Sequence, residues 1–110
     1  MKKMSMTAVT VLAVCSLVSA APAGEQSAKA HPGEKLFTQQ CAVCHPQGGN
    51  IINPQKTLSN KILSTNNIKT EEDIIKIMRK GAPGMSKFDT ASISDEDAKL
   101  IAGYILKTFK

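Results

Sequence analysis

The stretch QQCAVCHPQGGN, residues 39–50, holds Cys41 and Cys44, separated by two residues, with His45 directly after the second thiol. Thiols and an imidazole at this spacing occur in three kinds of site: a structural zinc site, a thiol–disulfide site and a site of covalent haem attachment. Each kind needs further parts from the rest of the chain, so the rest of the sequence decides among them.

The zinc site and the thiol–disulfide site lack their further parts. A zinc site needs four ligands, usually in paired sets, and the only other Cys or His after residue 20 is His31. A thiol–disulfide site would place Cys-x-x-Cys at a helix start within a βαβ pattern, which the sequence does not have.

Covalent haem attachment, in contrast, has Cys-x-x-Cys-His as its own spacing. Two thiols three positions apart lie on one side of a helical turn, so each can form a thioether to a haem vinyl group. The adjacent imidazole can then bind the iron from below. The sequence therefore predicts one covalently bound haem c, attached through Cys41 and Cys44, with His45 as the proximal iron ligand.

Residues 1–20 are expected to be a cleaved secretory signal peptide. Lys2 and Lys3 precede an apolar run over residues 8–18, and Val18-Ser19-Ala20 fits the small-residue pattern of a cleavage site. The apolar run is far shorter than the ~20 residues that span a bilayer. Export to the periplasm follows, with the thylakoid lumen or the cell exterior as less favoured destinations.

A second interpretation of the first residues depends on Cys15. The stretch Leu12-Ala13-Val14-Cys15 loosely resembles the lipobox of a lipoprotein, but valine fits poorly directly before the cysteine, and a better ordinary cleavage site follows. We therefore expect the exported chain to start near Ala21, or near Gly24. Residues 21–31 are small and polar and are expected to form a flexible lead-in.

The composition limits both the partners and the core. Without Lys2 and Lys3 the chain keeps twelve basic and nine acidic residues, a formal charge of +3, which is too mild to indicate a nucleic-acid partner. The chain has no Trp, one Tyr and three Phe, a thin aromatic supply for the core of so small a domain. A macrocycle at the centre of the core would make up for this.

Four segments have the pattern of short helices, and none alternates as a strand does. They are residues 34–41, which Pro32 can begin, and residues 58–63, followed by two longer helices with acidic first turns. Thr70 is the expected N-cap of the first longer helix, which ends with Arg79 and Lys80 before Gly81. Ser94 begins the second. We predict an all-α domain over residues 32–110, with three or four short helices and loops.

Over residues 32–110 the sequence resembles the class I c-type cytochromes. GEKLF precedes CAVCH, a turn-rich loop with a methionine follows, and the last helix carries Tyr104. The sequence is most similar to the small single-haem branch of soluble bacterial and c-six photosynthetic carriers, because GGNIINPQKTL is close to the GGNxxNPxKTL-type stretch of that branch. It differs where Met85-Ser86-Lys87-Phe88 replaces the usual Met-Pro-Ala-Phe. The resemblance implies the cytochrome c fold, with Gly33 and Phe37 packed across Tyr104.

The sixth iron ligand is expected to be Met85. This residue follows Gly84 in a loop with few other apolar residues, where a thioether would lack a partner unless it bound the iron. Met78 shares the apolar face of its helix with Ile74, which indicates core packing, and His31 is expected to be solvated. His/Met ligation raises the reduction potential and leaves no open site for oxygen or peroxide.

The proximal ligand also needs a second-shell contact. A ligating histidine usually donates its other ring N–H to an acceptor that fixes the ring. We predict a backbone carbonyl at Asn53 or Pro54 as this acceptor for His45, since that turn follows closely in the sequence.

The function predicted from these features is that of a soluble, monomeric single-electron carrier outside the cytoplasm, not an enzyme, with transient protein redox partners and no membrane contact in the exported form. Basic residues either steer encounter with acidic partner faces or form an ordinary solvated surface; they are Lys56, Lys61, Lys76, Lys80 and Lys87. Two alternatives remain. A haem sensor or peroxidase would need Met85 to be a labile ligand, and an accessory subunit of a redox complex would need an apolar exposed face.

Overall fold

The computed structural model describes residues 30–110. Its elements, in order, are α1 (Pro32–Gln40), the 3-10 turn η2 (Pro46–Gly48), α2 (Asn60–Thr65), α3 (Glu71–Lys80) and α4 (Asp95–Thr108). Within this range there is no strand, only an isolated bridge between Ala82 and Met85, so the predicted all-α fold is confirmed. No helix among these residues is long and apolar enough to cross a membrane. The expected signal peptide, Cys15 and residues 21–29 of the expected lead-in lie outside the described residues.

Helix α1 begins at a histidine cap. His31 has an extended backbone, and its Nδ1 accepts a hydrogen bond from the Gly33 N–H at 3.0 Å. Pro32 occupies the first turn, where a missing N–H costs nothing. The His31 side chain is half-buried, with its ring centroid 5.8 Å from that of Tyr104. The expectation that His31 is solvated is therefore wrong, because capping and aromatic packing hold it against the fold.

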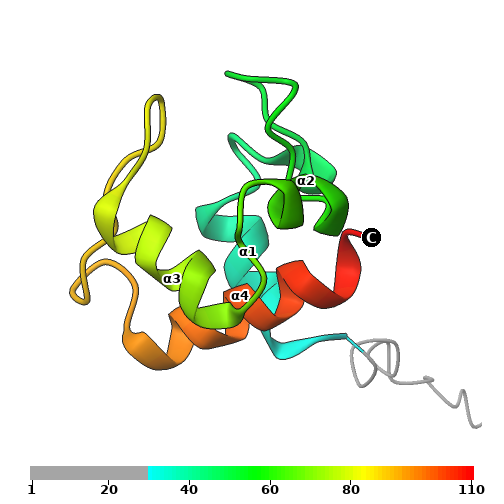
Figure 1. Cartoon of the computed structure of the whole chain (residues 1–110). Coiled ribbons are helices and arrows are strands. Elements are labelled where there is room, and N and C mark those ends of the chain that lie inside the picture. The colour runs from blue at the N-terminus through cyan, green and yellow to red at the C-terminus, as the bar shows by residue number, and fades with distance from the viewer. Residues whose placement is uncertain (1–29) are drawn as a thin grey trace, which may run out of the picture.

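Helices α1 and α4 pack against each other at very close range (Figure 1). A Cβ built on Gly33 would lie 2.0 Å from the Leu100 carbonyl oxygen and 2.9 Å from the Cβ of Tyr104, so only glycine fits there. The Phe37 ring lies 5.2 Å from Tyr104 and 5.3 Å from Phe109. The packing of Gly33 and Phe37 across Tyr104 that the resemblance implied is thus present.

Both longer helices begin at the predicted caps. The Thr70 hydroxyl accepts from the Asp73 N–H, and the Asp73 carboxylate accepts from the Thr70 N–H, which completes a capping box. At α4 the Ser94 hydroxyl accepts from the Asp97 N–H. Helix α3 ends at Gly81, whose φ of 75° is in the region that favours glycine.

Helix α2 begins two residues later than predicted. The side chain of Ser59 accepts from the Ile62 N–H and so fixes the start at Asn60. Asn60 then connects α2 to the end of the chain, because its N–H donates to the Phe109 carbonyl at 2.8 Å and its side-chain amide donates to the Leu106 carbonyl. The short helix is therefore fastened to the C-terminus.

Two long loops stand on the same side of the helical layer. The loop between η2 and α2 and the first part of the loop between α3 and α4 (yellow) rise to the top of the view, whereas the second part of the latter loop (orange) lies lower, toward the start of α4 (Figure 1). Most of the buried apolar residues lie below them, at the junction of α1, α3 and α4. The loops enclose the space in which the predicted haem ligands meet.

Candidate haem site

One cavity brings the predicted ligands together. It has a volume of about 660 Å³, which lies within the ordinary range for sites that hold small molecules and cofactors. Cys41, Cys44, His45 and Met85 all line it, whereas His31 does not. Polar side chains, among them Lys56, also line it, but most of its wall is apolar and includes Leu58, Ile62, Leu63, Ile68, Ile74, Ile77, Met78, Phe88 and Ile105.

The two cysteines lie in the turn that ends α1. Cys41 is the C-cap, with its N–H donating to the Phe37 carbonyl, and its own carbonyl accepts from the N–H groups of Cys44 and His45. Both thiols are free, and burial raises the pKa of Cys41 to about 11. A thiolate used for disulfide exchange or metal binding needs a lowered pKa, so this environment does not favour either alternative. Among residues 30–110, no three acidic, His or Cys side chains form a metal-binding group.

The ring of His45 is fixed by a carbonyl that the sequence analysis did not identify. Its Nδ1 lies 2.7 Å from the Gly49 carbonyl oxygen, so Nδ1 carries the proton and donates, which leaves Nε2 for an iron ion. The predicted acceptor, Asn53 or Pro54, is wrong. The chain turns back earlier than expected because Gln47 and Gly48 both have positive φ, 53° and 79°.

The two methionines of the described chain both line the cavity but differ in their setting. Met78 is 3% exposed within α3, among the core residues. Met85 is half-buried in a tight turn, in which its N–H donates to the Ala82 carbonyl and its carbonyl accepts from the Ala82 N–H. Gly84, with a φ of 81°, makes this turn possible.

Comparisons with known proteins agree with this arrangement. Residues 28–105 match the family described as cytochrome c oxidase, cbb3-type, subunit III. A cytochrome c6 from Cyanidium caldarium is 39% identical over 80 residues, which cover 73% of this chain and 72% of the relative. The chain is a class I c-type cytochrome.

Solved structures show the same fold. Outer membrane cytochrome F (OmcF) from Geobacter sulfurreducens superposes with a TM-score of 0.69 and 41% identity, covering 71% of this chain and 99% of that one. Cytochrome c6C from Synechococcus sp. PCC 7002 superposes with a TM-score of 0.65 and 28% identity, covering 70% of this chain and 93% of that one. As a member of this family, the cytochrome has one covalently bound haem c and is an electron carrier, not an enzyme.

The cavity of this cytochrome fits such a group. Apolar side chains form most of its wall, both cysteines line it, and none of the described residues that line it is a buried charged or polar residue. Two large apolar side chains of its lining, Val43 and Ile52, are exposed, with exposed fractions of 76% and 58%. Ile52 closes against the opposite loop, since a Cβ on Gly84 would lie 2.8 Å from its Cγ2.

The sequence analysis missed two residues of this cytochrome that support the site. The Gly49 carbonyl carries no side-chain signal, although the consecutive glycines at 48 and 49 indicate an abrupt turn. Arg79 was interpreted only as a basic residue at a helix end. In the structure its guanidinium donates to the carbonyls of Phe88 and Ile93, both in the loop between α3 and α4 that carries Met85.

Proposed function

We propose that this cytochrome is a single-electron carrier with His/Met-ligated haem, exported to the periplasm. The observation that supports this most is the single cavity that both cysteines, His45 and Met85 line. In this proposal Cys41 and Cys44 would hold the haem as thioethers, and Nε2 of His45 and the Met85 sulfur would be the protein ligands of its iron. The bound haem supplies the reversible one-electron change.

The chain's own residues supply orientation and exclusion of water. The Gly49 carbonyl holds the His45 ring and makes it a more basic ligand, which tunes the potential. The apolar wall keeps water from the metal and lowers the local polarity. Two such protein ligands would leave no open position on the iron for oxygen, which would favour a carrier over a peroxidase or a sensor.

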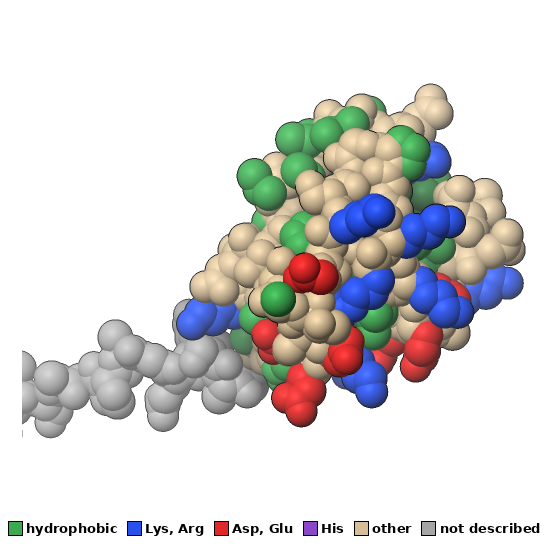
Figure 2. Space-filling view, turned by 90° about the vertical axis from the view of Figure 1, so that its left-hand side faces the viewer, with side chains coloured by type: hydrophobic (Ala, Val, Ile, Leu, Met, Phe, Trp, Pro, Cys, Tyr) green, Lys and Arg blue, Asp and Glu red, His purple; other side chains and the backbone are tan. Residues whose placement is uncertain are grey.

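Electron exchange is proposed to occur at the exposed part of the cavity lining, which contains Val43 and Ile52. On the face that contains α3 and the loop after it, basic side chains cross the middle and apolar ones gather toward the upper edge (Figure 2). Acidic side chains lie lower on that face. A partner with an acidic rim around an apolar patch would match this arrangement, and its contact would be small and short-lived.

A haem-bearing subunit of a larger redox complex is the second candidate function. Two observations favour it: the matched family is described as an oxidase subunit, and three large apolar side chains are exposed, those of Val43, Ile51 and Ile52. The two candidates differ in how the native protein sediments. A carrier sediments as a monomer in a periplasmic extract, whereas a subunit remains with a large membrane complex after mild detergent extraction.

Attachment to the envelope is a second possible location. The structural neighbour OmcF is described as an outer membrane cytochrome, and Cys15 of this chain stands in a lipobox-like stretch. The intact mass of the exported protein distinguishes the two. A soluble carrier starts at Ala21 or Gly24 with one haem adduct, whereas a lipoprotein starts at Cys15 with acyl chains.

The test of His/Met ligation uses carbon monoxide, which binds ferrous haem only where an axial position is open. The haem-loaded protein should be reduced and reoxidised reversibly by one electron per chain, and carbon monoxide should leave its reduced spectrum unchanged. Rapid formation of a carbon monoxide complex at neutral pH would contradict the proposal and favour a sensor or a peroxidase.

A further inference from the structure

Local hydrogen bonds form the turn that carries Met85, but contacts further along the chain hold this turn against the helices. The paired hydrogen bonds between Ala82 and Met85, at 2.8 and 3.2 Å, form the turn without tying it to a helix. The chain returns to α3 at Phe88, whose N–H donates to the Met78 carbonyl at 2.8 Å. The position of Met85 therefore depends on how firmly Phe88 is held, as well as on the contact of Gly84 with Ile52.

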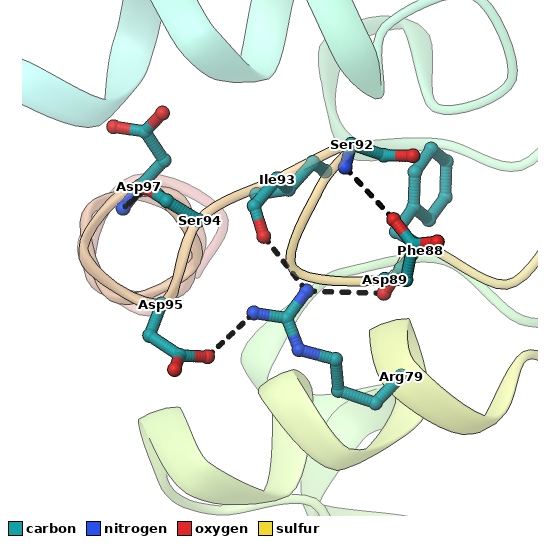
Figure 3. Close-up of polar contacts among 8 residues, drawn as sticks. All are labelled: Arg79, Phe88, Asp89, Ser92, Ile93, Ser94, Asp95 and Asp97. Carbon is teal, nitrogen blue, oxygen red and sulfur yellow. Dashed lines mark hydrogen bonds and ion pairs between the residues drawn. The ribbon is translucent and has the colours of Figure 1, made fainter.

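One side chain holds this segment from α3 (Figure 3). Nη1 of Arg79 donates to the Phe88 carbonyl at 3.0 Å and to the Ile93 carbonyl at 2.8 Å. Nη2 of the same guanidinium pairs with the Asp95 carboxylate at 2.7 Å, at the first residue of α4. A single planar group thus bridges α3, both ends of the 88–93 segment and the start of α4.

The contacts to the two carbonyls matter more than the ion pair. The Asp95 side chain is 77% exposed, and ion pairs in such a setting contribute little. The Arg79 side chain is only 23% exposed, so its bonds to Phe88 and Ile93 are charge-assisted and partly shielded from water. A lysine has a single ammonium and cannot reproduce the fork that reaches two carbonyls and a carboxylate together.

We propose that Arg79 is a positioning residue for the distal iron ligand, an inference that rests on the proposed ligation by Met85. Both backbone groups of Phe88 are hydrogen-bonded: its N–H donates to the Met78 carbonyl, and its carbonyl accepts from Arg79. Because Phe88 follows Met85 by three residues, its anchoring limits how far the thioether can withdraw from the cavity. Without the guanidinium, the open form of the loop, in which the Met85 thioether has withdrawn from the cavity, is more populated.

The population of the open form can be measured through an external ligand. The apparent affinity of ferric haem for imidazole scales with the fraction of molecules in which the methionine is away from the iron. We expect Arg79→Met and Arg79→Lys to raise this affinity at least tenfold in the haem-loaded protein. Asp95→Asn is the matched control, because it removes the ion pair and leaves both carbonyl contacts, and it should stay within about twofold of the wild type.

Urea unfolding of the same proteins separates positioning from general support. Arg79 variants that lose stability but bind imidazole like the wild type would overturn the inference, and so would an Asp95→Asn effect as large as that of Arg79→Met. If Arg79→Met does not load haem, the imidazole affinity of Arg79→Lys alone decides whether the inference holds. A spectrally silent Met85→Ala would refute the proposed ligation and this inference together. If Met85→Ala opens the iron while the Arg79 variants stay closed, only the inference fails.

Discussion

The backbone oxygen of Gly49 lies 2.7 Å from Nδ1 of His45, four residues earlier in the chain. Two residues with positive φ, Gln47 and Gly48, bring the carbonyl to this position. The orientation of the imidazole thus depends on a backbone conformation that glycine at position 48 makes easy to adopt.

Gly48→Ala should therefore lower the free energy of unfolding and loosen the histidine contact. A residue with a Cβ costs about 1–2 kcal/mol in the left-handed region, and the added Cβ would lie 2.5 Å from Cδ1 of Phe109. The reduction potential should rise, because a poorer hydrogen bond makes His45 a weaker donor to ferric iron. Urea unfolding and a redox titration measure both effects.

The matched control is the neighbouring glycine. Gly49 has a φ of −74°, and the nearest atom to an added Cβ is the Pro46 carbonyl oxygen at 3.2 Å. Gly49→Ala should therefore cost clearly less than Gly48→Ala and leave the potential nearly unchanged. Equal effects of the two substitutions would show that φ at Gly48 does not control the histidine.

The crossing of α1 and α4 gives a second contrast between two glycines. Gly33→Ala places a Cβ against the Leu100 carbonyl. Overpacking of this kind typically costs about 1–3 kcal/mol and occasionally more, so the free energy of unfolding should fall by about that amount. At Gly103 the nearest atom is a flexible one, Oε1 of Glu71 at 3.1 Å. Gly103→Ala should be neutral or stabilising by up to about 1 kcal/mol, because alanine favours a helix interior. Thermal unfolding that ranks the two variants in the opposite order would contradict the description of the crossing.

The choice between the two methionines can be tested directly. Met85→Ala should abolish the ferric thioether charge-transfer absorption and admit water or small ligands to the iron, with weak peroxidase activity as a result. Met78→Leu keeps the core volume, so it should cost less than about 1.5 kcal/mol and leave the spectrum unchanged. The reverse pattern would move the ligand onto α3.

The start of α3 should make stability depend on pH in the acid range. Hydrogen bonds from the backbone N–H groups of Lys69 and Thr70, with the Thr70 side chain, hold the pKa of Asp73 below its ordinary value of 3.8. The ionised form is favoured by folding, so its contribution is complete above 3.8 and is lost as the pH falls through the lower folded value.

Asp73→Ala should consequently lower the urea midpoint at neutral pH, and the difference from the wild type should shrink as the pH drops below 3.8. Glu72→Ala is the control, and it should not show this pH dependence. Glu72 lies in the same turn and is exposed but accepts neither of the two backbone hydrogen bonds. A difference that stays constant down to the lowest pH would mean that the Asp73 carboxylate does not stabilise the helix through its charge.

The sequence predicted those parts of the fold that depend on local chemistry. The caps Thr70 and Ser94 are confirmed because a hydroxyl before acidic residues favours a helix start wherever it occurs. The start of α2 was misplaced by two residues because Ser59 was not recognised as its cap. His31 was misjudged because its role depends on Tyr104, far away in the sequence.

The site shows the same division. Cys41, Cys44 and His45 form a local motif, so their proximity to one another could be predicted, and the cavity they share with Met85 agrees with the resemblance. The acceptor for His45 was wrong because the direction of a loop depends on φ values, which neighbouring side chains do not reveal well. The hydrogen bonds of Arg79 join residues on separate segments, and no residue spacing in the sequence predicts such contacts.

The contact between Gly33 and the Leu100 carbonyl also bears on how the chain folds. Helices α1 and α4 come from opposite ends of the described chain, so their crossing closes a single long loop that contains all the intervening segments, at a cost in chain entropy. Isolated helices form within about a microsecond, whereas contacts between distant segments slow folding by orders of magnitude. Because short helices are marginally stable in isolation, these helices should gain most of their stability when the crossing forms. Burial of the Phe37 ring against Tyr104 would then report the rate-limiting step.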